Sequence, residues 1–185
     1  MINLPSGKTY LDPVFLLEKL GVLSGMKVAD FGCGAGYFTL QAAEMVGNAG
    51  RVYALDIFKP NLSAVWSKVK TRGYDNVVRC VWTDLEIYGG ARKIKDGSVD
   101  RGILTNVLHQ SKKQKDILRE CARLLKDEGK LLVVDWSKTA AFGPKENQLV
   151  SQERVRTMAA EVGLAEMERF KAGSYHWGMI FVKTH

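Results

Sequence analysis

The stretch Val28-Ala29-Asp30-Phe31-Gly32-Cys33-Gly34-Ala35-Gly36 decides which fold this sequence predicts. An apolar segment typical of a buried strand breaks into glycines at alternate positions, and an amphipathic segment follows them. Glycine carries no Cβ, so the backbone can turn tightly there and a ligand can approach it closely. The unpaired amides and the positive dipole end of the following helix attract a negative or electron-rich group. The stretch therefore predicts the first strand, turn and helix of a nucleoside-binding Rossmann-type unit.

Strand and helix signals alternate along the rest of the chain. A short N-terminal helix between Asp12 and Gly21 precedes the first strand, which we expect over residues 26–31. Ser111 and Gln114 form a candidate capping box for a helix over residues 111–126. Other helices are predicted after Gly36, from Pro60 and around Val155, and further strands at 51–56, 77–82, 99–105, 130–134, 165–170 and 177–183.

This alternation predicts an α/β fold, a Rossmann-like doubly wound sheet of seven mostly parallel strands with helices on both faces. The ending breaks the pattern, because residues 171–176 are too few for a crossover helix between the last two strands. These strands must pair antiparallel if they are neighbours. Otherwise the final strand is inserted antiparallel elsewhere in the sheet. Either arrangement predicts an antiparallel last strand.

Length and composition suit a single domain over residues 1–185. The chain has 185 residues and 46% hydrophobic content, and we divide it into an N-terminal helical extension (1–24) and a Rossmann-like core (25–185). No stretch is apolar over the length needed to span a membrane, and the first residues lack a signal-peptide pattern. Cys33, Cys80 and Cys121 are scattered and offer no metal-ligand pair. We therefore expect a cytoplasmic protein with reduced cysteines and no metal.

The order Asp30-x-Gly32-x-Gly34-x-Gly36 resembles the first motif of the class I S-adenosylmethionine-dependent methyltransferases, Asp/Glu-x-Gly-x-Gly-x-Gly. The resemblance spans residues 28–183, because that family also ends with a seventh, antiparallel strand. It implies S-adenosylmethionine as the cofactor. A dinucleotide site needs Gly-x-Gly-x-x-Gly or Ala, and the sixth position is Tyr37 or Thr39. A nicotinamide-dependent oxidoreductase or a non-catalytic cofactor-binding module is therefore the weaker alternative.

In an open parallel sheet the ligand lies beyond the carboxyl ends of the strands. Asp56 follows the second strand at a spacing where a carboxylate can accept both ribose hydroxyls, although it could simply cap the next helix. The resemblance implies that Asp84 accepts the adenine amino group and that Asp30 lies near the methionine end or bonds to the loop. Cys33 could merely fill a tight turn. The predicted cofactor-binding residues are Asp30, Gly32, Cys33, Gly34, Ala35, Gly36, Asp56, Ile57, Thr83, Asp84, Leu85, Asn106 and Val107.

The segment after the fourth strand carries the candidate for catalysis. Methyl transfer from a sulfonium mainly needs an aligned acceptor, and a base is useful only when the acceptor is protonated. His109 is the predicted catalytic residue because the pKa of histidine lies near neutrality, although packing or solvation would explain it too. Asp135 and Trp136 could shape an acceptor pocket or serve as a cap and a surface cover. Residues 137–150 and the N-terminal helix near Tyr10 are the predicted lid.

The wider pattern looks like the methyltransferase subgroup that acts on small molecules, including quinone-biosynthesis and arsenite-type enzymes. The arsenite type needs clustered cysteines, and nucleic-acid amino-methylating enzymes need an Asn/Asp-Pro-Pro-aromatic box; the sequence has neither. The net charge of +7 and the lysines at 112, 113 and 115 fit an anionic acceptor or RNA phosphate, or a solvated face. We expect a small-molecule acceptor, with an RNA or protein methyltransferase as the alternative. The oligomeric state is not predicted.

Overall fold

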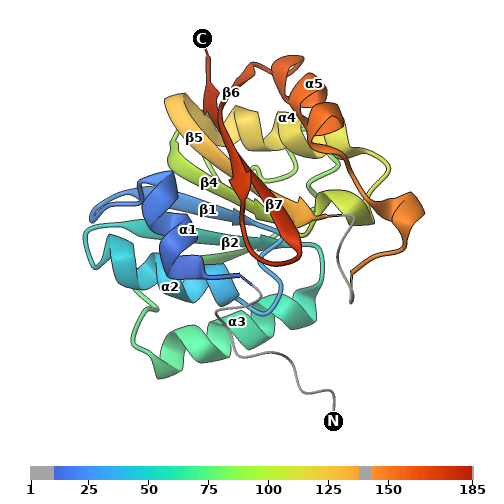
Figure 1. Ribbon diagram of the computed structural model, residues 1–185. Helices are drawn as coiled ribbons and strands as arrows, with labels where there is room; N and C mark the ends of the chain where they lie inside the picture. Colours follow the sequence, from blue (N-terminus) through green and yellow to red (C-terminus); the bar gives the residue numbers. More distant parts are fainter. Residues whose placement is uncertain (1–10, 138–142, 185) are drawn as a thin grey trace.

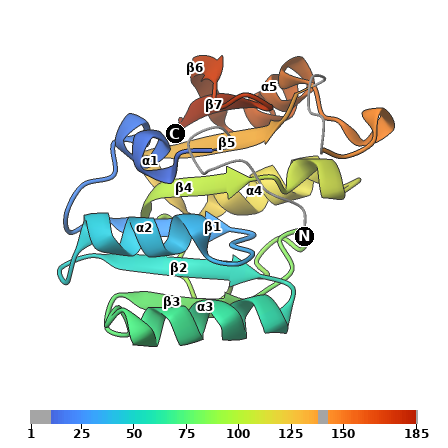
Figure 2. The same cartoon turned by 60° about the horizontal axis from the view of Figure 1, so that its bottom comes forward.

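The structure, a computed structural model, describes residues 11–137 and 143–184. Its strands form one seven-stranded sheet in the order β3-β2-β1-β4-β5-β7-β6 (Figures 1 and 2). The predicted seven-stranded, mostly parallel sheet is therefore confirmed. The strands are β1 (Lys27–Phe31), β2 (Arg51–Asp56), β3 (Val78–Trp82), β4 (Val99–Thr105), β5 (Leu125–Trp136), β6 (Leu164–Lys171) and β7 (His176–Lys183).

Helices cover both faces of the sheet, as the sequence predicts. One hydrophobic core lies between the sheet and α1, α2 and α3, and a second core lies between the opposite face and α4 and α5 (Figure 1). Each described helix contributes an apolar stripe to one of these cores. The helices are α1 (Pro13–Leu20), α2 (Tyr37–Val46), α3 (Lys59–Thr71), α4 (Gln114–Leu124) and α5 (Gln152–Ala160), with 3₁₀ turns η1 (Leu108–Gln110) and η2 (Glu146–Gln148).

The last strand runs against the others. β7 pairs antiparallel with β5 on one side and with β6 on the other. Both arrangements that the sequence left open therefore occur together: the last two strands are antiparallel neighbours, and β7 is inserted between β5 and β6. The parallel strands β1, β2, β3 and β4 all end at the same edge of the sheet, where the glycine turn follows β1 (Figure 2).

Helix α1 begins and ends where the sequence predicts. The Asp12 carboxylate accepts a hydrogen bond from the Phe15 amide at 3.2 Å, and Gly21 ends the helix with a left-handed φ of 76°. Leu16, Leu17 and Leu20 are fully buried against the sheet. Among the described residues, no helix is long and apolar enough to cross a membrane.

Helix α4 begins later than predicted, and its predicted capping box is wrong. The Ser111 hydroxyl donates to Glu86 at 2.7 Å and accepts from the Lys113 amide at 2.8 Å, so it closes a local turn outside the helix. The Gln114 side chain donates to the Leu108 carbonyl at 3.1 Å. Both side chains are occupied by the 3₁₀ turn and a distant loop, so the helix begins at Gln114 with no side-chain cap.

Strand β5 begins earlier than the predicted residue 130. Leu125 already pairs with Val99, and the register then shifts before Lys130 pairs with Arg101. The intervening residues form an irregularity in which Glu128 adopts a left-handed φ of 63°. The helix predicted over residues 111–126 is therefore wrong at its end, because α4 ends at Leu124 and Leu125 already pairs with β4.

Candidate cofactor and active site

Two adjoining cavities lie at the carboxyl ends of β1, β2, β3 and β4. The larger has a volume of about 300 Å³ and the smaller about 260 Å³. They share Gly32, Gly34, Asn106 and Gln110, so they form the two ends of one groove. The larger end holds the predicted residues Asp56, Ile57, Thr83, Asp84, Leu85 and Val107, and the smaller end holds Asp30 and Cys33.

Two predicted cofactor residues lie outside this groove. Ala35 and Gly36 line a separate hollow, together with Lys68 and Arg72. The Lys68 ammonium donates to the Ala35 carbonyl at 2.8 Å, which ties the far side of the glycine turn to α3. We infer that these two residues shape the turn from behind and do not line the groove.

The glycine turn is held in place by strand β2. The Gly32 and Cys33 amides donate to the Leu55 carbonyl at 2.8 and 2.9 Å. Gly32 has a φ of +76°, and a Cβ there would lie 2.5 Å from a Val107 methyl group. At Gly34, by contrast, φ is +49° and a Cβ would meet no atom within 4 Å. Gly32 is thus required by conformation and packing, whereas Gly34 leaves open space toward the groove.

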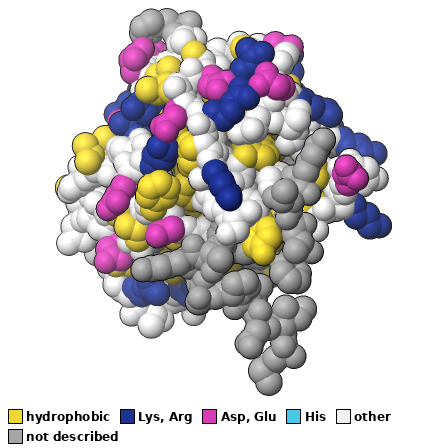
Figure 3. All heavy atoms as spheres, in the orientation of Figure 1, with side chains coloured by type: hydrophobic (Ala, Val, Ile, Leu, Met, Phe, Trp, Pro, Cys, Tyr) yellow, Lys and Arg dark blue, Asp and Glu magenta, His cyan; other side chains and the backbone are white. Residues whose placement is uncertain are grey.

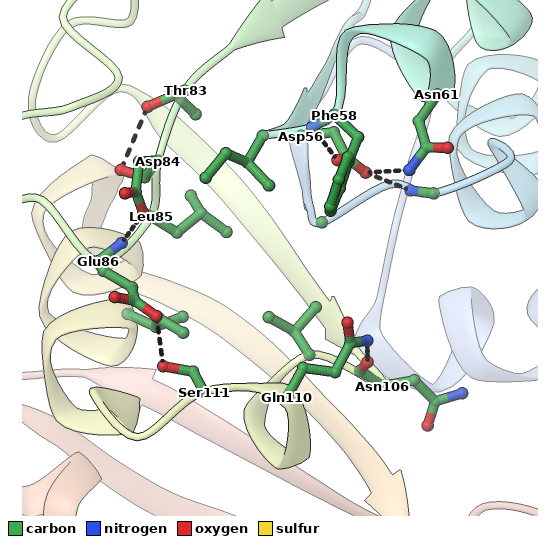
Figure 4. A pocket seen from close by; sticks show the side chains of 15 residues that line it. Asp56, Phe58, Asn61, Thr83, Asp84, Leu85, Glu86, Asn106, Gln110 and Ser111 are labelled. Carbon is green, nitrogen blue, oxygen red and sulfur yellow. Dashed lines mark hydrogen bonds between the residues drawn. The ribbon is translucent and has the colours of Figure 1, made fainter. Parts of the chain in front are cut away.

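Asp56 ends β2 and binds the glycine turn directly. Its Oδ2 accepts from the Gly34 amide at 2.9 Å and from the Asn61 side chain at 3.1 Å, and its Oδ1 accepts from the Phe58 amide at 2.8 Å (Figure 4). A carboxylate offers about four acceptor positions, so Asp56 can accept one more hydroxyl hydrogen without losing a present partner. The sequence suggested that Asp56 accepts two ribose hydroxyls, but three of its acceptor positions are already used by the glycine turn and the start of α3.

Asp30 is buried at the other end of the groove. The Thr39 hydroxyl donates to its carboxylate at 2.5 Å. Burial raises the pKa of Asp30 to about 6, and the nearby charge of Asp56 adds to this rise. The hydrogen bonds from Thr39 lower the pKa, but by less than burial raises it. Burial also raises the pKa of the Cys33 thiol, which keeps that side chain protonated. Asp30 is therefore the groove residue whose charge changes just below neutral pH.

Asn106 lies at the junction of the two ends and has a strained backbone. Its φ is +58°, a left-handed value that asparagine tolerates better than most residues. Its Oδ1 and the Thr105 hydroxyl are buried without a hydrogen-bond partner among the described residues. The Gln110 side chain donates to the Asn106 carbonyl at 2.6 Å (Figure 4). Unpaired acceptors beside buried Asp30 suit a ligand that brings an amino group, which S-adenosylmethionine does.

The loop after β3 forms the outer wall of the larger end. Thr83 and Leu85 are buried, and Asp84 accepts from the Glu86 amide at 2.9 Å. The Glu86 carboxylate accepts from the Ser111 hydroxyl, which joins this loop to the segment after β4 (Figure 4). Lining residues of the larger end that the sequence did not predict are Phe58, Asn61, Glu86, Ser111 and Ile117. Asn61 alone carried a usable signal, as a polar residue in the first turn of the helix after Asp56.

His109, in η1, is fixed by the end of β5. Its Nδ1 lies 2.8 Å from Asp135 Oδ1, and its amide donates to Asp135 Oδ2 at 3.1 Å. Because a carboxylate only accepts, His109 Nδ1 carries the proton and Nε2 is left as an acceptor. The ring of the neighbouring His176 lies tilted against the Trp136 ring, with the ring centres 4.3 Å apart. Burial lowers the pKa of His176 to about 4, so it is neutral at pH 7.

The sequence also predicted a lid, a group of lysines near α4 and the absence of a metal. Tyr10 and residues 138–142 of the predicted lid lie outside the described residues. Lys113 pairs with Glu86 at 3.4 Å, and Lys115 pairs with Glu161 at 2.5 Å. In the described ranges 11–137 and 143–184, no three His, Cys, Asp or Glu side chains could hold a metal ion.

Comparison with known proteins agrees with this geometry. The family described as "Methyltransferase domain" matches residues 29–133, which is more than half of the chain. The ubiquinone/menaquinone biosynthesis C-methyltransferase UbiE of Azotobacter vinelandii is 33% identical over 67% of this chain and 47% of its own length. The demethylmenaquinone methyltransferase of Anoxybacillus flavithermus is 28% identical over 69% of this chain and 52% of its own. The chain thus spans about half the length of these curated relatives.

A solved structure matches almost end to end. It is a SAM-dependent methyltransferase from Aquifex aeolicus, with a TM-score of 0.87 and 26% identity over 97% of this chain and 94% of that one. The residues matched by the family include the last three residues of β1, the glycine turn, and β2, β3 and β4. The family match also decides against the dinucleotide-binding alternative. The chain therefore belongs to the methyltransferase domain family of the class I S-adenosylmethionine-dependent methyltransferases.

Proposed function

We propose that this chain transfers a methyl group from S-adenosylmethionine to a small-molecule acceptor. The observation that carries the proposal is the convergence of the glycine turn, Asp56 and the loop after β3 on one groove. Asp56 and Asp84 would hold the adenosine end, and Asp30 with Asn106 would hold the methionine end. This assignment is supported by a nucleoside-sized cavity at one end and a buried carboxylate at the other.

Isothermal titration calorimetry tests the cofactor assignment. We expect S-adenosylhomocysteine to bind, and nicotinamide and flavin dinucleotides not to bind. Asp56→Ala should weaken S-adenosylhomocysteine binding by roughly 1.5 to 3 kcal/mol, the range for hydrogen bonds to a charged group. Asn61→Ala is the graded comparison: it removes one partner of Asp56 and one groove-lining side chain but leaves the carboxylate, so it should weaken binding less than Asp56→Ala. Binding of a dinucleotide with no effect of the adenosyl ligand would reverse the assignment.

We further propose that the acceptor is a quinone-type ring in its reduced, hydroxylated form. The support is the kinship with proteins named as ubiquinone/menaquinone and demethylmenaquinone methyltransferases. Because this chain spans only about half the length of these relatives, their acceptor is proposed for it and not transferred to it. The reduced ring fits the chemistry of the site, because its carbon becomes nucleophilic once a hydroxyl proton is withdrawn. An anionic group on the acceptor, which the sequence suggested, would find fewer free lysines near α4 than expected, since Lys113 and Lys115 are paired.

In this scheme His109, which precedes the groove residue Gln110 but is not among the residues that line the groove, is the general base. S-adenosylmethionine supplies a methyl group on a positively charged sulfur, which keeps the electron pair of the bond that breaks. His109 Nε2 accepts the proton that the acceptor loses, while Asp135 keeps the opposite nitrogen protonated and the ring oriented. The main-chain hydrogen bond from His109 to Asp135 fixes the turn as well as the ring.

Turnover with reduced demethylmenaquinone of short side chain tests the base. His109→Gln should lower kcat by about 100-fold or more, with S-adenosylhomocysteine affinity unchanged. Asp135→Asn should lower kcat as well, because an amide can present a donor to Nδ1 and favour the other tautomer. An unchanged rate for His109→Gln across neutral pH would show that positioning alone accounts for methyl transfer.

We also propose that the protein acts in the cytoplasm. The free cysteines Cys33, Cys80 and Cys121 support this placement, because none of them forms a disulfide and a reducing compartment keeps thiols in that state. Fractionation of cells that produce the tagged protein tests the proposal, which predicts recovery with the cytosolic fraction.

A further inference from the structure

Glu120 is a fully buried carboxylate that the proposed methyl transfer does not use. It lies on α4, with an exposed fraction of 0%. Its Oε2 accepts from the Gly89 amide at 2.8 Å, and its Oε1 accepts from the Ala91 amide at 2.9 Å. The Arg123 guanidinium donates to both oxygens, at 2.8 and 2.6 Å. Burying a charge costs free energy unless it is paired and hydrogen-bonded. Apolar packing of α4 therefore does not explain why a carboxylate stands here and binds two amides of a distant loop.

The carboxylate is ionised despite its burial. Desolvation by itself would raise the pKa of Glu120, but the hydrogen bonds from Arg123, Ala91 and Gly89 together lower it below its usual value. Arg123 is itself almost buried, contacts Asp96, and lies 5.9 Å from the centre of the Tyr88 ring. Both members of the ion pair lie on α4, and both contact the segment after β3: Glu120 through the Gly89 and Ala91 amides, and Arg123 through Asp96 and Tyr88.

The loop that Glu120 holds is the outer wall of the groove. It begins with Thr83, Asp84 and Leu85, which line the larger end, and it returns to the core at Ala91. Gly90 folds back on the start of the loop so closely that a Cβ there would lie 2.6 Å from the Asp84 carbonyl oxygen. The Ile87 amide also donates to the Asp84 carbonyl at 3.3 Å. Displacing the Gly89 and Ala91 amides would therefore displace Asp84.

Helix α4 thus contributes to the groove twice. Ile117 lines the larger end directly, and Glu120 one turn later holds the opposite wall. We propose that Glu120 is a positioning residue for the cofactor: its buried carboxylate fixes the loop of Asp84 at the adenine end of the groove. This inference rests on the proposed function, because it names the ligand that the wall would contact. It assigns Glu120 no contact with that ligand.

The test is a double-mutant cycle on S-adenosylhomocysteine affinity, measured by calorimetry. Glu120→Gln keeps the side-chain shape but offers one acceptor atom in place of two, so one loop amide loses its partner. We expect about tenfold or greater weakening of binding. If Glu120 acts through the loop, this effect is largely lost in the Asp84→Asn background and is fully retained in the Asp56→Ala background. A change in global stability would act equally in both backgrounds.

Controls keep the test independent of folding. Glu153→Gln is the matched variant, because it neutralises an exposed glutamate on α5 that pairs with Arg156 and Arg169 away from the groove. It should bind as the wild type does. If Glu120→Gln does not fold, Arg123→Lys enters the same cycle, since it keeps a cation beside Glu120 but loses the two-pronged contact. Its expected effect is smaller and has the same dependence on Asp84.

Amide hydrogen exchange gives a readout that needs no ligand. In Glu120→Gln the Gly89 or the Ala91 amide, whichever no longer has an acceptor, should exchange at least tenfold faster, while the amides of β1 and β4 keep their wild-type rates. A folded Glu120→Gln variant that binds S-adenosylhomocysteine as tightly as the wild type, or whose effect simply adds to that of Asp84→Asn, would overturn the inference. Failure of the wild type to bind that ligand would instead overturn the proposed function, and the exchange rates would still decide whether Glu120 holds the loop.

Discussion

At the scale of single residues, three buried carboxylates in and beside the groove differ in the hydrogen bonds that they accept. Asp56 accepts three hydrogen bonds, and two of them come from the backbone that it positions. Glu120 accepts four, two of them from a guanidinium. Among the residues that the structure describes, Thr39 is the one hydrogen-bond partner of the Asp30 carboxylate, and burial raises the pKa of Asp30 to about 6. Asp30 is therefore the carboxylate that costs stability when it ionises.

Asp30→Asn should stabilise the protein in a pH-dependent way. The pKa of Asp30 is about 6 in the folded chain and 3.8 ordinarily, so the folded state binds more protons between these values. Wild-type unfolding free energy should therefore fall as pH rises from about 4 to 6 and then level off. A neutral amide avoids this loss, so the variant's advantage should grow over that window to at most about 3 kcal/mol. Urea unfolding of both proteins at several pH values measures it; a difference independent of pH would contradict the assignment.

At the scale of elements, the contact between α2 and α3 depends on the last glycine of the turn. Gly36 caps the start of α2 with a φ of +81°, and a Cβ there would lie 2.9 Å from a Val65 methyl group. Val65 is fully buried on α3. Gly36 therefore serves helix packing, which explains why it lies outside the groove that its motif builds.

Gly36→Ala should destabilise the fold more than an alanine at another left-handed glycine. Gly73 is the matched control, because its φ is +72° and a Cβ there would meet no atom within 4 Å. Gly73→Ala should cost about 1 to 2 kcal/mol from backbone strain alone. Gly36→Ala carries the same strain plus overpacking against Val65, which adds roughly 1 to 3 kcal/mol. Equal losses of unfolding free energy in the two variants would show that Val65 yields freely.

At the scale of the whole molecule, two of the three lysines at 112, 113 and 115 are paired with acidic side chains, which fits the solvated face that the sequence left open. On the face shown in Figure 3, basic and acidic side chains are interspersed. Lys19 pairs with Glu168 at 2.5 Å, and on α4 Lys115 pairs with Glu161 at the same distance. Paired charges of this kind favour solubility over the binding of a polyanion. The division into an extension over 1–24 and a core over 25–185 stays a prediction.

Because Lys113 and Lys115 are paired, we expect methyl transfer in a cell extract to reach small molecules and not polyanions. We expect label from radioactive S-adenosylmethionine in the low-molecular-weight fraction, and little in RNA or protein. Changing Lys112 and Lys115 to Gln should leave the rate unchanged, because neither side chain lines the groove. Label in RNA, with activity that falls steeply between low and moderate salt, would instead indicate phosphate contacts and favour the nucleic-acid alternative.

Much of the architecture follows from local sequence patterns. The apolar run before Gly32, the periodicity of each helix and the short link between the last two strands predict a doubly wound sheet with an antiparallel last strand, and the structure confirms it. The residues at strand ends, such as Asp56 and Asp84, could be named as groove candidates from the same patterns. Hydrophobic periodicity and glycine spacing are properties of neighbouring residues, so they can be recognised without knowing the pairing of distant segments.

Side-chain partners from distant segments were decided only by the tertiary structure. Glu120 holds amides some thirty positions earlier in the chain, and Asp135 orients His109 from another strand. Ser111 bonds to Glu86 and not to its own helix, which is why its capping prediction was wrong. Such pairings depend on which strands are neighbours and in what register they lie. A carboxylate, hydroxyl or imidazole has the same appearance in the sequence whichever partner the folded chain brings to it.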